Sequence, residues 1–106
     1  MWMGIGSSFN ILIFSQLYKM LKYFVEFLGT MLLSFVVFGT GNYIAIGAAL
    51  AVAVLLGGKI SGVAFNPAIA VGLMVSGKLR NNELLPYIIA EVLGGLAGFE
   101  LSKMIV

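Results

Sequence analysis

The chain has 106 residues, of which 61% are hydrophobic and 9% charged, and its net charge is +2. Because a soluble domain carries about a quarter charged residues, this composition indicates an integral membrane protein with room for a few helical spans. The sequence contains no cysteine and no histidine, so an enzyme, a metal site or a cofactor is not expected, and the small, dispersed charge argues against a nucleic-acid partner.

Residues 1–19 mix apolar side chains with serine, asparagine and glutamine. No cationic segment precedes the apolar stretch, so a cleavable signal peptide is not expected. The stretch is read either as a helix lying on the membrane surface or as a poorly ordered extension, with Met20 as the natural start. We therefore divide the chain into an N-terminal extension, 1–19, and one membrane unit, 20–106.

The stretch from Phe27 to Gly58 carries no charged side chain and is too long for one span of about 30 Å of hydrocarbon. Residues 39–42 are its only turn-like segment, since glycine and asparagine accept the backbone angles of a tight reversal. The pattern predicts a first span over 21–39 and a second over 43–57.

Residues 59–65 are expected to leave the helix, because the glycines around them weaken it. Asn66 then predicts a helix start, since its side chain can accept a backbone N–H, and Pro67 suits the first helical position. The apolar helix that follows, 68–75, ends before Gly77 and has only about half the length of a span.

An apolar helix of half-span length after a glycine-containing loop indicates a re-entrant segment. Irregular backbone at membrane depth is tolerated only where protein buries it or a water-filled cavity wets it. A third span is predicted over 84–104, where Gly94 and Gly98 are spaced to let another helix approach closely. Helix packing is therefore the role expected of these two glycines.

The basic residues predict the orientation of the chain. In this topology Lys103 alone lies on the side of the C-terminus. The other five basic residues lie on the side that holds the N-terminus: Lys19, Lys22, Lys59, Lys78 and Arg80. The positive-inside rule then places the N-terminus in the cytoplasm and the C-terminus outside.

Three segments resemble the N-terminal repeat of the major intrinsic protein family, the aquaporins and glycerol facilitators. They are 26–30 (EFLGT), 58–68 (GKISGVAFNPA) and 87–95 (YIIAEVLGG). A lone Asn-Pro-Ala is a weak signal, but the preceding Ser-Gly and the flanking spans make the match specific. The resemblance implies an all-α membrane protein, with three transmembrane helices plus one re-entrant half-helix, and a passive pore for water or small polyols.

The resemblance also implies roles for single residues. Glu26 and Ser61 would anchor the re-entrant loop, whereas the alternative is that Glu26 pairs with Lys22 at the membrane surface. Glu91 stands where the family often has glutamine, and it is either protonated or paired with another chain. The implied pore-lining residues are Gly62, Val63, Ala64, Asn66, Pro67, Ala68 and Ile46.

Two features depart from the family pattern. Ile46 replaces a filter aromatic residue, which suggests a wider passage unless Ile46 simply packs between helices. The chain also carries one half-helix where the family pore uses two, so we expect an oligomer, either with itself or with an inverted second half-channel. The alternatives are a small proton- or substrate-coupled transporter that uses Glu26 and Glu91, and a truncated, nonfunctional fragment.

Overall fold

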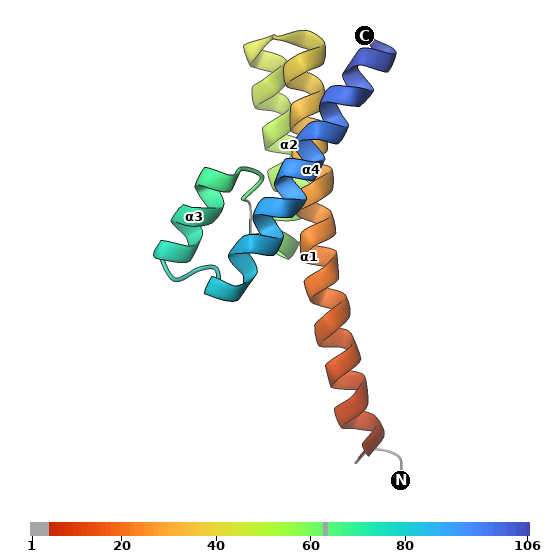
Figure 1. The fold of residues 1–106 in the computed structure, drawn as a ribbon, viewed down its shortest axis with the longest axis vertical. Helices are drawn as coiled ribbons and strands as arrows, with labels where there is room; N and C mark the ends of the chain where they lie inside the picture. Colours follow the sequence, from red (N-terminus) through yellow and green to blue (C-terminus); the bar gives the residue numbers. More distant parts are fainter. Residues whose placement is uncertain (1–4, 63) are drawn as a thin grey trace.

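The computed structural model describes residues 5–62 and 64–106, and these residues form four helices (Figure 1). The helices are α1 (Ile5–Thr40), α2 (Tyr43–Ser61), α3 (Pro67–Val75) and α4 (Asn81–Ile105). Helices α1, α2 and α4 are long and apolar enough to cross a membrane, whereas α3 has nine residues. The predicted all-α fold, with three spans and one half-helix, is confirmed.

Helix α1 is longer than the predicted first span. Its 36 residues correspond to about 54 Å at 1.5 Å per residue, well beyond the roughly 30 Å of a hydrocarbon core. The N-terminal part of α1 accordingly extends past the start of α4 in Figure 1. The structure thus makes residues 5–19 a direct continuation of the first span, and the division of the chain at residue 19 stays a prediction.

The reversal between α1 and α2 follows the predicted turn chemistry. Gly41 has φ +59°, in the left-handed region that glycine adopts at little cost. The Asn42 side chain then accepts hydrogen bonds from the backbone N–H groups of Ile44 and Ala45, at 2.9 and 3.0 Å. This cap satisfies two of the donors that a helix start leaves open.

Helix α2 continues to Ser61, so the prediction that the chain leaves the helix at residue 59 is wrong. Each glycine lowers helix propensity by only about 1 kcal/mol, which tertiary packing can offset. Gly57 is packed so closely that an added Cβ would collide with Val25 on α1. The helix ends instead where Gly62 adopts φ +85° and its N–H donates to the Gly58 carbonyl.

Helices α1 and α4 cross at close range (Figure 1). A Cβ added at Gly94 or Gly98 would collide with backbone carbonyls of α1, those of Phe27 and Met31 respectively. The Ser34 hydroxyl also donates to the Gly95 carbonyl across this contact, at 2.6 Å. Helix α2 packs against α1, and α3 packs against α4. The outer faces of the long helices expose many large apolar side chains, as lipid contact requires.

Candidate functional site

The start of α3 is built by Asn66 and Pro67. The Asn66 side-chain oxygen accepts a hydrogen bond from the Ala68 N–H at 2.8 Å, and Pro67 occupies the first turn, where a missing donor has no consequence. Asn66 is exposed, and its amide nitrogen makes no hydrogen bond within the described residues. The positive end of α3 therefore presents free donors to a neighbouring molecule.

The segment before α3 is held by Glu26. This side chain is 0% exposed, and its carboxylate accepts hydrogen bonds from the N–H groups of Phe65, at 2.7 Å, and Ala64, at 3.4 Å. Phe65 is the one non-glycine residue with positive φ in the described chain, at +51°. The alternative pairing of Glu26 with Lys22 is wrong, because Lys22 instead contacts both oxygens of Glu83 at 3.0 Å.

Tyr87 ties α4 to the end of α2. Its ring is fully buried, and its hydroxyl donates to the Ser61 carbonyl at 2.5 Å. The ring also meets that of Tyr23 edge to face, with centroids 5.8 Å apart. Ser61 thus contacts α4 through its backbone, while its own hydroxyl donates to the Gly57 carbonyl within α2.

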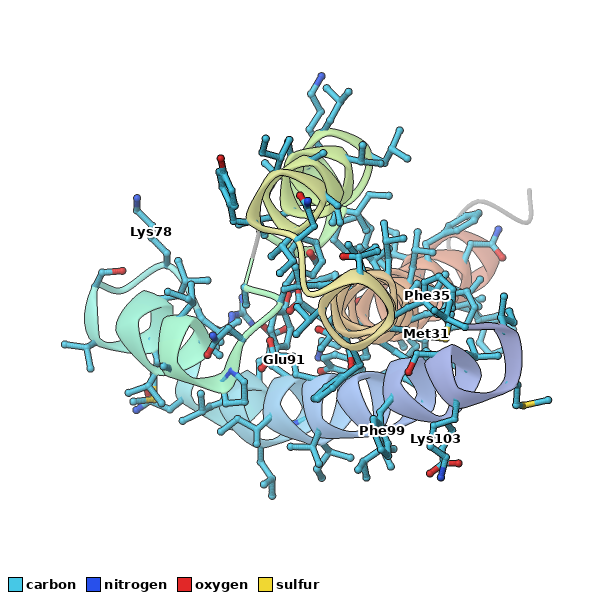
Figure 2. All side chains as sticks on the ribbon, turned by 90° about the horizontal axis from the view of Figure 1, so that it is seen from above. Met31, Phe35, Lys78, Glu91, Phe99 and Lys103 are labelled. Atoms are coloured by element: carbon cyan, nitrogen blue, oxygen red, sulfur yellow. The ribbon has the colours of Figure 1, made fainter. Side chains whose placement is uncertain are left out.

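Glu91 is the least satisfied group of the site. Figure 2 places it between α1, α4 and the segment that leads into α3. It is 1% exposed and lies beside the Glu26 carboxylate and the Asn66 backbone N–H, yet neither of its oxygens makes a hydrogen bond within the described residues. A buried carboxyl in this state is costly unless it carries a proton or gains a partner.

The structure brings some of the predicted lining residues together and separates others. Asn66 and Ala68 are exposed at the start of α3, whereas Ala64 is 4% exposed and faces the interior. Gly62 is exposed at the end of α2, where it lines a cavity together with Leu73 and Lys78 from the other end of α3. Val63 lies outside the described residues. Ile46 is half-buried near the opposite end of α2, 15 residues before Ser61, which corresponds to about 22 Å of helix.

Two contacts of the site carried no signal in the sequence. Lys22 and Glu83 are 61 positions apart, and no local pattern connects them. The hydrogen bond of the Tyr87 hydroxyl to Ser61 was not predicted either, although Tyr87 begins one of the three segments that resemble the family. In the described part of the chain, no cluster of His, Cys, Asp or Glu could hold a metal ion. The groups that the structure places at the site are hydrogen-bond donors and acceptors and the positive end of α3.

Comparison with known protein families gives a match over most of the chain. The family model described as "MIP: Major intrinsic protein" matches residues 13–106, a stretch that includes α2, α3 and α4 in full and most of α1. No curated protein and no solved structure matches the chain.

Proposed function

Because the chain belongs to the major intrinsic protein family, whose members are channels for water or small solutes, we propose that it forms half of a passive pore. The permeants are water and glycerol-like neutral molecules. The observation that carries this proposal is the capped start of α3, where exposed donors of Asn66 stand on a loop held by the buried Glu26. A half-helix anchored in this way is a fixed polar site among apolar spans.

The chemistry of that site suits a neutral molecule that both donates and accepts hydrogen bonds. The Asn66 amide and the positive end of α3 attract an oxygen atom, and the carbonyls of Gly62, Val63 and Ala64 are proposed to accept the hydrogens of the same molecule. A cation is repelled by the positive helix end, and proton hopping is disfavoured because the donors fix the orientation of each water.

We further propose that a second, inverted half-helix faces Asn66. Exposed polar groups at membrane depth cost several kcal/mol each unless protein or water satisfies them. A second half-channel would close the pore around the open donors of Asn66, either as another copy of this unit or as an inverted half of different sequence. Pro67, Ala68 and Ile46 complete the proposed lining, while the N-terminus is proposed to lie in the cytoplasm.

The test is osmotic shrinkage of vesicles that contain the purified chain, followed by stopped-flow light scattering. Asn66→Asp keeps the oxygen that caps α3 but removes the amide donor and adds a negative charge. We expect water flux above the lipid background to fall about tenfold, which corresponds to the roughly 1.4 kcal/mol that one hydrogen bond to the permeant contributes.

Asn42→Asp is the matched control, because Asn42 caps α2 in the same way but lies at the turn between α1 and α2. Its flux should equal that of wild type. Wild-type flux at the lipid background, with insertion of the protein demonstrated and with a candidate second half added, would contradict the proposal.

A second candidate function is proton-coupled transport. The observation that favours it is Glu91, a buried carboxyl without a hydrogen-bond partner in the described chain, next to Glu26. Intramembrane acids of this kind mark proton relays in transporters. Solute uptake that requires a pH gradient and is lost in Glu91→Gln would support this candidate, whereas flux independent of the gradient supports the pore.

A further inference from the structure

We propose that a cavity at the basic end of the helix bundle binds the phosphate of an anionic phospholipid. The cavity has a volume of about 530 Å³ and lies where α1, the α3–α4 connection and the start of α4 meet. We call it the basic cavity. It is lined by Ser15, Tyr18, Lys19, Lys22, Gly77, Lys78, Arg80 and Glu83. This proposal is independent of the pore.

The charge of the basic cavity is strongly positive. Its one acidic side chain, Glu83, is already committed to Lys22, whose ammonium contacts both carboxylate oxygens at 3.0 Å. The three other cations are Lys19, Lys78 and Arg80, and none of them has an ion pair within the described residues. Three uncompensated positive charges around one cavity call for an anion with more than one negatively charged oxygen.

Backbone donors add to this field. Arg80 is the N-cap residue of α4, a helix of 25 residues, and its side chain makes no capping hydrogen bond. The N–H group of Glu83 donates to the Arg80 carbonyl at 3.0 Å, so those of Asn81 and Asn82 remain open beside Arg80, at the positive end of the helix. A phosphate at this position would accept from these N–H groups and from the arginine together, an arrangement common at helix starts.

The neighbouring surface identifies the anion as a lipid headgroup. An apolar groove of about 770 Å³ runs between α1 and α4, lined by residues such as Leu17, Met20, Phe24 and Ile89. On α1 the groove and the basic cavity begin at the same level of the helix but occupy different faces, since Leu17 and Met20 line the groove while Tyr18 and Lys19 line the cavity. A phospholipid fits this surface, with its phosphate among the cations at the end of the bundle and its acyl chains against the exposed apolar side chains of the surrounding helices.

The experiment is native mass spectrometry of the detergent-purified chain, titrated with phosphatidylglycerol or with phosphatidylcholine of the same acyl chains. We expect tighter binding of the anionic lipid, and a loss of about fivefold in affinity for each cation removed. The triple variant Lys19→Gln, Lys78→Gln, Arg80→Gln should therefore bind phosphatidylglycerol about a hundredfold more weakly than wild type. Its elution profile and helical content should match wild type, because the three side chains make no ion pair that the substitutions would break.

Two controls and one competitor keep the outcome decisive. Lys103→Gln, at the opposite end of the bundle, should bind like wild type, and Arg80→Lys should stay within about threefold of wild type because it keeps the charge. Equal binding of the two lipids, or unchanged binding in the triple variant, would overturn the proposal. Displacement of phosphatidylglycerol by millimolar inorganic phosphate would overturn the lipid assignment, since it would identify a site for the free anion.

Discussion

At the scale of single residues, the loop before α3 depends on a strained phenylalanine and a buried acid. Phe65 has φ +51°, a conformation that costs a residue other than glycine about 1–2 kcal/mol. Its ring is 2% exposed and lies against Gly29 of α1 and Gly57 of α2, where no side chain stands in the way. Its N–H is bound by Glu26 at 2.7 Å. Burial of the ring and this hydrogen bond together hold the strained backbone in place.

Replacement of the acid should loosen this loop. Glu26→Leu keeps a similar volume but leaves the N–H groups of Ala64 and Phe65 buried without an acceptor. Because each of the two unsatisfied buried donors costs about 1–3 kcal/mol, the free energy of unfolding should fall by about 2–6 kcal/mol. The measurement is an unfolding titration in detergent micelles, followed by circular dichroism.

Two further variants define what Glu26 does. Glu26→Gln retains one acceptor oxygen and adds an amide that can donate to the unpaired carboxyl of Glu91, so its loss should be clearly smaller than that of the leucine variant. Glu100→Gln alters an exposed acid on α4 and should stay within about 0.5 kcal/mol of wild type. Equal stability of Glu26→Leu and wild type would show that the hydrogen bonds to the loop contribute nothing.

At the scale of helices, the crossing of α1 and α4 sets the geometry of the site. Gly94 and Gly98 let the two backbones approach so closely that α4 carries Glu91 to the side of Glu26. Without a hydrophobic driving force between helices in lipid, such contacts depend on close packing and on hydrogen bonds like that of Ser34 to the Gly95 carbonyl.

Adding a methyl group at Gly98 tests the close packing of α1 against α4. Gly98→Ala would place a Cβ against the Met31 carbonyl and the Ser34 side chain, so α4 must shift, at a cost of about 1–3 kcal/mol in unfolding free energy. Gly95→Ala is the matched control, because an added Cβ there meets nothing within 4 Å. We expect it to leave stability unchanged or to raise it by up to about 1 kcal/mol through helix propensity. Equal effects at the two positions would rule out a close-packing role for Gly98.

At the scale of the whole molecule, charge is concentrated at one end of an apolar bundle. Lys19, Lys22, Lys78 and Arg80 line a single cavity, and Lys59 lines an adjacent one, whereas Lys103 lies near the end of α4. The basic end is proposed to face the cytoplasm, as the positive-inside rule requires.

Cysteine labelling should report the orientation of the chain in the membrane. The sequence contains no cysteine, so every labelled thiol of the protein is the one introduced. Tyr43→Cys at the start of α2 and Asn82→Cys at the start of α4 are both exposed and belong to opposite ends of the bundle. In intact cells a membrane-impermeant maleimide should label the variant at position 43, and it should reach position 82 only after permeabilisation. Labelling of both variants in intact cells would be evidence for insertion in two orientations.

The sequence by itself determined the class of protein, the three spans and the half-helix. These features follow from local rules: the length of apolar stretches, the turn residues at 39–42, and the capping pair of Asn66 and Pro67. It misplaced the end of α2, because the contacts of Gly57 with α1 offset a weak local propensity.

Only the tertiary structure decided how the site is assembled. It paired Lys22 with Glu83, left Glu91 without a partner in the described chain, and gave Phe65 its positive φ. These outcomes depend on the distance between α1 and α4, which two glycines and the carbonyls opposite them fix across more than 60 positions of sequence. A local pattern cannot encode such a distance, because it arises only when the helices pack.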